Sequence, residues 1–146
     1  MMTATGKLQA LEISRDGAPI TVLDQRRGAF TLNGQSYNVR PISAFLARSY
    51  ELRRGDEVLA FAKSVPFVNR TAVSSGGKTW LLKAENFRAT RFGLYDGATR
   101  LGGIASGDWF RPWNGATIDM ADTLPLDVQM FLTSVVLFKW AAANSA

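Results

Sequence analysis

Along most of this chain, apolar and polar residues alternate in short stretches that turn residues separate. A side-chain period of two is typical of strands with one buried face. The clearest turn is Asn33-Gly34, because both residue types tolerate the positive φ angles of a two-residue hairpin turn. Further hairpin turns are expected near Gly55, Gly76-Gly77 and Gly97. The segments predicted to carry strands are 8–14, 19–24, 29–39, 47–64, 67–84, 90–106 and 114–120.

The pattern changes in the segment LPLDVQMFLTSVVLFKW, residues 124–140. Thr123 can cap a helix, and Pro125 is tolerated in a first helical turn, so a helix is predicted over about 125–141. Its apolar residues cover nearly the whole circumference. A helix of this kind is either enclosed by protein or set in lipid.

Length favours enclosure over a membrane anchor. The uncharged stretch between Asp127 and Lys139 holds eleven residues, which span roughly 16 Å. A bilayer core is about 30 Å thick. We therefore expect a mainly β protein, a closed barrel of about 10–12 antiparallel strands around a central hydrophobic C-terminal α-helix. Residues 1–7 are expected to be a flexible N-terminus and residues 8–146 a single domain. A C-terminal membrane anchor stays the alternative.

Two hairpin segments resemble each other at an offset of 42 residues. Residues 50–59 can be laid over residues 92–101, and an aromatic residue, a leucine, the turn glycine and a closing leucine coincide. This pattern indicates either a structural repeat or a combination that many hairpins share.

The hairpins Tyr50-x-Leu52…Gly55…Leu59 and Phe92-x-Leu94…Gly97…Leu101, followed by a late apolar helix, resemble the Tubby-like C-terminal superfamily. That superfamily includes the Tubby domain, the plant LURP-one-related proteins and the phospholipid scramblases. The resemblance covers roughly residues 28 to 143. It implies a closed barrel around a central helix and association with membrane phospholipid. The cysteine-rich segment of scramblases is absent, so lipid binding is implied rather than lipid transport.

The charge distribution of the chain favours an anionic partner. The formal net charge of the 146 residues is +5. Residues 40–91 alone carry ten basic residues against four acidic ones, which favours phospholipid headgroups, nucleic acid or an acidic protein as partner. The alternative is a set of basic residues spread over a solvated surface.

The chain has neither cysteine nor histidine, so no thiolate metal site, Ser-His pair or Cys-His pair can form. The carboxylate pairs Asp119/Asp122 and Asp56/Glu57 are assigned to turns and the helix start. No catalytic residue, metal site or cofactor is expected. The N-terminus lacks a secretory signal pattern, and we expect a cytoplasmic protein with peripheral membrane association and no transmembrane segment.

Basic and aromatic residues supply the candidate binding site. The segment DWFRPWNG, residues 108–115, places two tryptophans around an arginine in a loop. Such side chains either enter a membrane interface or stack on a base, or they plug one end of the barrel. The predicted function is a non-enzymatic module for anionic phospholipid or phosphoinositide headgroups, and the alternative is a nucleic-acid-binding β-barrel. The candidate ligand-binding residues are Arg48, Arg53, Arg54, Lys63, Arg88, Arg91, Trp109, Arg111 and Trp113.

Overall fold

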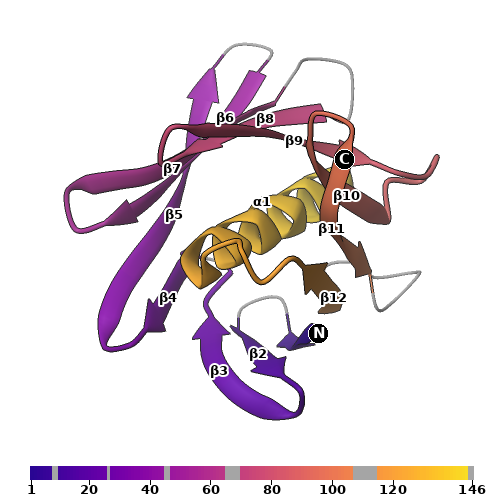
Figure 1. Cartoon of the computed structure of the whole chain (residues 1–146). Helices are drawn as coiled ribbons and strands as arrows, with labels where there is room; N and C mark the ends of the chain where they lie inside the picture. Colours follow the sequence, from indigo (N-terminus) through magenta and orange to yellow (C-terminus); the bar gives the residue numbers. More distant parts are fainter. Residues whose placement is uncertain (8–9, 26, 45–46, 65–69, 107–114, 145–146) are drawn as a thin grey trace.

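The computed structural model describes the chain except residues 8–9, 26, 45–46, 65–69, 107–114 and 145–146 (Figure 1). The described residues form one helix and twelve strands. In chain order they are β1 (Met2–Lys7), β2 (Ala10–Arg15), β3 (Ala18–Leu23), β4 (Ala29–Leu32), β5 (Gln35–Ala44), β6 (Ala47–Arg54), β7 (Glu57–Ser64), β8 (Arg70–Ser75), β9 (Lys78–Ala84), β10 (Arg91–Asp96), β11 (Thr99–Ser106), β12 (Gly115–Met120) and α1 (Leu126–Asn144).

The strands form a single antiparallel sheet that curls into a nearly closed barrel around α1 (Figure 1). Its order is β3-β2-β1-β12-β11-β10-β9-β8-β7-β6-β5-β4, so successive strands are neighbours everywhere except at β1 and β12. That pairing joins the last strand to the first hairpin. The predicted fold class, a barrel of antiparallel strands around a C-terminal helix, is confirmed.

The barrel has a seam between β3 and β4, where the backbone ladder is reduced to a single bridge between Asp24 and Ala29. A side chain takes the place of the missing ladder. The Thr21 hydroxyl donates to the carbonyl of Thr31 at 2.7 Å, and the Thr31 amide lies 3.4 Å from the same hydroxyl oxygen. The single hydroxyl of Thr21 therefore bonds both the carbonyl and the amide of Thr31 and helps to hold the seam.

Helix α1 fills the barrel and is buried on all sides. Its apolar residues from Val128 to Leu137 form the centre of the core. Three polar residues, Gln129, Thr133 and Ser134, are buried with them, and buried polar groups need hydrogen-bond partners. Thr133 donates to the carbonyl of Gln129 at 2.8 Å, and Gln25 at the seam donates to the carbonyl of Ser134 at 3.2 Å. In the described part of the chain, α1 is not long and apolar enough to cross a membrane, and it is the one helix there.

The hairpins β6–β7 and β10–β11 share more than their sequence pattern. The register shifts after Leu52 in the first and after Leu94 in the second, which leaves Leu59 and Leu101 as the extra residues. All of these positions are 42 residues apart. Hairpin β2–β3 carries a similar shift after Ile13. Bulges of this kind increase strand twist and help a sheet to close.

The first strand begins earlier than the alternation in the sequence indicates. The predicted strands start at residue 8, but Met2–Lys7 forms β1, which pairs with β2 on one side and β12 on the other. The physical reason is a short alternation in which Met2 and Ala4 are buried while Thr3 and Thr5 are exposed. Its inward residues include an alanine, so the pattern carries little hydrophobic signal.

Candidate functional site

The two ends of the barrel are built differently. At the turn end, tight turns join the hairpins, and Asn33 and Gly34 have the positive φ angles of 51° and 76° that their turn requires. The start of α1 lies at this end, beside Ile118 and Met120 of β12. The opposite end, where β5, β7, β9 and β11 finish, holds the C-terminal part of α1.

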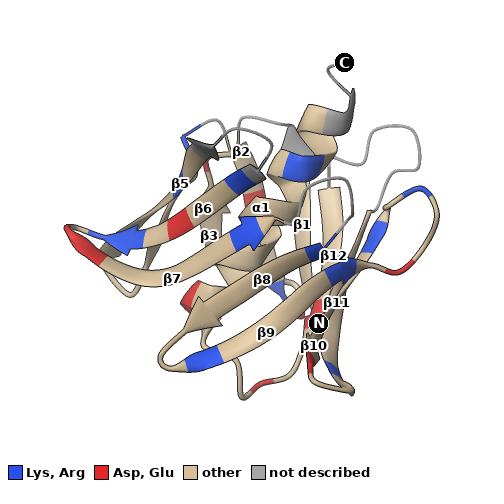
Figure 2. Cartoon of the chain, turned by 90° about the horizontal axis from the view of Figure 1, so that it is seen from above, with Lys and Arg blue, Asp and Glu red and all other residues tan. Residues whose placement is uncertain are grey.

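The opposite end is basic, and we call it the basic end. Figure 2 shows lysine and arginine positions on β6, β7 and α1 around the C-terminal part of the helix. Among the first or last two residues of the described strands at this end, no residue is acidic. The basic residues of the basic end, with one in the β9–β10 connection and one in α1, are Lys7, Arg48, Lys63, Arg70, Lys83, Arg88, Arg91 and Lys139.

The structure separates the predicted site residues into two groups. Arg48, Lys63, Arg88 and Arg91 belong to the basic end. Arg53 and Arg54 lie at the turn end, where each is bound by a carboxylate, as the next paragraph describes. Trp109, Arg111 and Trp113 lie outside the described residues.

Arg53 and Arg54 each form an ion pair at the turn end, so they do not share a site with the basic end. The Nε atom of Arg53 lies 2.8 Å from Glu51, and Nη2 of Arg54 lies 3.2 Å from Glu57. Both arginines lie at the turn between β6 and β7, whereas Arg48 lies at the other end of β6. The sequence grouped these arginines because they are close along the chain, whereas β6 carries them to opposite ends of the barrel.

Glu85 follows the last residue of β9 at the basic end, and its charge is matched by Arg100. Arg100 donates to both carboxylate oxygens of Glu85, at 2.9 and 2.7 Å, and the Tyr95 hydroxyl also donates to it. These bonds, above all those from Arg100, hold the pKa of Glu85 at about 2. Glu85 therefore stays ionised and paired with Arg100.

At the basic end, polar side chains line the mouth of the barrel interior. Arg48 lies on the same face of β6 as the buried Tyr50, because alternate residues share a face. Ser64 and Thr71 face inward from β7 and β8, and their hydroxyl oxygens are 3.4 Å apart. Lys139 of α1 donates to Ser64 at 2.7 Å. The mouth thus combines two cations with several hydroxyl groups.

Lys139 is held in an unfavourable environment for a charge. Burial, and then the positive charge of Arg48, lower its pKa from 10.5 to about 8. The groups that face it are Arg48, Ser64 and Thr71, none of which can neutralise an ammonium. A cation kept in such a position is more typical of a binding site than of a stabilising core.

Replacing Lys139 with methionine should stabilise the protein at pH 7, by roughly 2 kcal/mol. The folded protein binds fewer protons than the unfolded chain between pH 8 and 10.5, so the wild type gains stability relative to the variant as pH rises through that window. Urea unfolding of both proteins at pH 7 and pH 10 measures the difference in their free energies of unfolding. A variant that is less stable than the wild type at pH 7, with a difference that does not change with pH, would contradict this account.

A cavity of about 300 Å³ opens beside Arg48. It lies between the end of β5, the start of β6 and Phe138 of α1. Phe138 stacks on Tyr50 with a ring-centroid distance of 5.9 Å. The hydroxyl of Tyr50 is buried and has no hydrogen-bond partner among the described residues.

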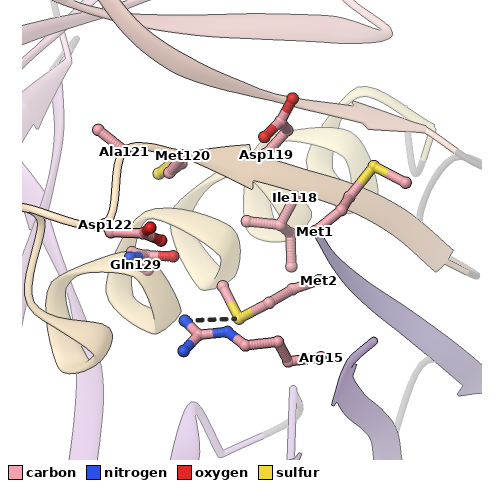
Figure 3. Close-up of a pocket in the computed structure, with 9 residues that line it drawn as sticks. All are labelled: Met1, Met2, Arg15, Ile118, Asp119, Met120, Ala121, Asp122 and Gln129. Atoms are coloured by element: carbon pink, nitrogen blue, oxygen red, sulfur yellow. Dashed lines mark hydrogen bonds between the residues drawn. The ribbon is translucent and has the colours of Figure 1, made fainter. Parts of the chain in front are cut away.

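A second cavity, of about 320 Å³, lies at the turn end (Figure 3). Asp119 and Asp122 both line it, but Figure 3 shows the carboxyl group of Asp122 beside Gln129 and that of Asp119 pointing away. Arg15 lies 3.9 Å from the sulfur of Met2 rather than between the carboxylates. The two aspartates are not arranged as an acid–base pair.

Among the described residues, the large apolar side chain with the greatest exposure is not one of the predicted site residues. Phe87, with a relative exposure of 101%, lies in the β9–β10 connection at the basic end. Asn86 fixes this connection by bonding the Thr90 hydroxyl at 2.7 Å and the Thr90 amide at 3.0 Å. Buried Trp140 donates to the carbonyl of Ala89 at 2.5 Å. The sequence ENFRATR does contain an aromatic between polar residues, which is the signal that could have identified it.

The side chains of the basic end can be grouped by their chemistry. The described residues contain no group of three or more acidic, histidine or cysteine side chains that could hold a metal ion. The groups at the basic end are cations, hydroxyls and aromatic rings. Such groups can bind an anion and an apolar surface.

The fold and this site together define a class, an antiparallel β-barrel closed around a C-terminal helix, with a basic end that presents an exposed aromatic residue. Comparisons with protein-family models, with curated proteins and with solved structures gave no match to this chain. The resemblance to the Tubby-like superfamily therefore stays a prediction.

Proposed function

We propose that this protein is a non-enzymatic binding module that attaches peripherally to anionic phospholipid surfaces through its basic end. The observation that carries the proposal is Phe87, fully exposed at an end of the barrel that is rich in cations. An aromatic ring that enters the interface while cations meet headgroups is a common way for soluble domains to bind membranes. The resemblance to the Tubby-like superfamily points to the same ligand class.

The connection that carries Phe87 is fixed before binding. Beyond the bonds of Asn86 and Trp140, the Glu85 amide donates to the carbonyl of Arg91 at 2.8 Å, and the Ser106 amide donates to the carbonyl of Thr90 at 2.9 Å. A fixed connection loses little conformational entropy when its tip enters a lipid surface. Phe87 is therefore presented at low entropic cost.

The cations near Phe87 come from adjacent strands. Arg70 of β8 is the register partner of Lys83 of β9, and Lys83 is one residue before the end of its strand. Arg91 begins β10, directly after the connection. Each basic residue near an anionic membrane surface contributes about 1 kcal/mol at low salt. These three residues and Arg88 of the connection, together with one aromatic side chain, are enough for measurable vesicle binding.

Phe87→Ala should weaken binding to anionic vesicles roughly tenfold, because burial of a phenylalanine ring contributes about 1.5–3 kcal/mol. Co-sedimentation with vesicles of phosphatidylcholine and phosphatidylserine at low salt measures this effect. The matched control is Val58→Ala, an apolar residue of 48% exposure at the turn end, which should bind as the wild type does.

Two results would overturn the proposal. One is equal binding of the wild type to neutral and anionic vesicles, and the other is an equal effect of Phe87→Ala and Val58→Ala. Binding to single-stranded or duplex oligonucleotides without binding to vesicles would assign the basic end to nucleic acid instead.

A further inference from the structure

The cavity at the mouth of the barrel has the chemistry of a ligand site rather than of a packing defect. At about 300 Å³ it is at the lower limit of small-molecule sites. One side of it is apolar and the other carries a guanidinium and hydroxyl groups. The residues that line it are Pro41, Ile42, Arg48, Ser49, Tyr50 and Phe138.

The hydroxyl of Tyr50 is the first sign of a missing ligand. A buried hydroxyl without a well-aligned partner is costly, and native proteins rarely keep one without a functional reason. Burial raises the pKa of Tyr50, while the charge of Arg48 and the closeness of its guanidinium to the hydroxyl lower it. The hydroxyl therefore keeps its proton at neutral pH and can donate it to a hydrogen bond.

The two cations at the mouth are the second sign. Arg48 is exposed and belongs to none of the ion pairs among the described residues. Lys139 uses one donor on Ser64, and an ammonium group has three. The positive charge of Arg48 acts on Lys139 without a carboxylate between them. An anion placed between these two groups would remove their repulsion.

We propose that this cavity binds a phosphate group carried on a small organic body. Arg48 would hold two phosphate oxygens with its planar fork, a geometry that suits phosphate. The Tyr50 hydroxyl would bind a remaining oxygen, and Lys139, which lies outside the cavity wall beside Phe138, would add the charge of its ammonium. Pro41, Ile42 and Phe138 would contact the carbon atoms of the ligand.

The phosphate has two possible sources, a lipid headgroup and a soluble phosphate ester. The cavity shares the basic end with the membrane contact proposed above, but the residues differ. Phe87 and the cations near it serve the membrane surface, whereas Arg48, Tyr50 and Lys139 serve the cavity. The two proposals can therefore fail independently.

The test is calorimetric titration of the full chain with glycerol 3-phosphate, with glycerol as the uncharged control. We expect the wild type to bind glycerol 3-phosphate and not glycerol. Arg48→Ala should weaken binding tenfold or more, and Tyr50→Phe about fivefold, because each variant lacks a donor to the phosphate oxygens and the donor of Tyr50 is uncharged. The matched control is Arg54→Ala at the turn end, which should leave the affinity unchanged.

Folding and pH provide separate readouts. Tyr50→Phe removes an unpaired hydroxyl, so the unliganded variant should melt at or above the wild-type temperature. The affinity for glycerol 3-phosphate should fall between pH 7.5 and 9.5 as Lys139 loses its proton, while Arg48 and the Tyr50 hydroxyl stay protonated.

The outcomes separate the two sources and the two proposals. Loss of both glycerol 3-phosphate and phosphatidic acid vesicle binding in Arg48→Ala supports the cavity with a lipid headgroup as source. Loss of glycerol 3-phosphate binding alone supports the cavity with a soluble ester. If neither glycerol 3-phosphate nor inorganic phosphate binds, or if Arg48→Ala and Arg54→Ala behave alike, the cavity proposal is overturned, whatever the vesicle result for Phe87→Ala.

Discussion

Val135→Asp should unfold the whole barrel at room temperature. Val135 is 0% exposed and lies in the middle of α1, surrounded by the inward faces of the strands. A carboxylate placed there without a partner costs at least several kcal/mol, and a domain of this size is stable by only about 5–15 kcal/mol. Circular dichroism should show loss of the β signal and of cooperative melting.

The same substitution at an exposed site is the control. Val22 is 55% exposed on β3, opposite Glu12 of β2, so Val22→Asp should lower the free energy of unfolding by only about 1 kcal/mol. Equal melting temperatures for Val135→Asp and the wild type would show that α1 is not enclosed in solution. A large loss in Val22→Asp would instead point to an unrecognised contact at the seam.

Gly102→Ala should destabilise the barrel by about 3–5 kcal/mol. Gly102 lies at the bulge of β11 with a φ of 148°. A Cβ atom there would collide with the carbonyl oxygen of Asp119 and lie 2.6 Å from the Cα of Met120. Both atoms belong to the backbone of β12, which is held between β11 and β1 and cannot move away.

Gly97→Ala separates the collision from the backbone strain. Gly97 also has a positive φ, of 59°, but a Cβ there would meet no atom within 4 Å. Its substitution should cost only about 1–2 kcal/mol. Urea unfolding measures the loss in the free energy of unfolding of each variant. Equal losses for Gly102→Ala and Gly97→Ala would refute the close approach of β12 to Gly102.

The fold was predictable because its signals are local. Alternation marks the strands, the Asn33-Gly34 turn fixes a hairpin, and the apolar circumference of residues 125–141 requires an enclosure. These features depend on neighbours along the chain, which a sequence displays directly.

The site was harder to predict because it depends on which residues meet across the barrel. A single strand carries Arg48 to one end and Arg54 to the other, so proximity in sequence was misleading for this group. Phe138 reaches Tyr50, and Lys139 reaches Ser64, only when the helix lies inside the strands. The exposure of Phe87 depends on Asn86 and Trp140, whose bonds no local pattern reveals.

The position of α1 at the centre of the barrel also sets the order of folding during synthesis. The ribosome makes all twelve strands before the helix, yet the strands have no other core to close around. Pairing of β1 with β12 likewise waits for most of the chain. Contacts between such distant segments make folding slow. The emerging hairpins therefore expose their apolar faces until α1 has been made, and this interval is when the chain is most prone to aggregate or to need a chaperone.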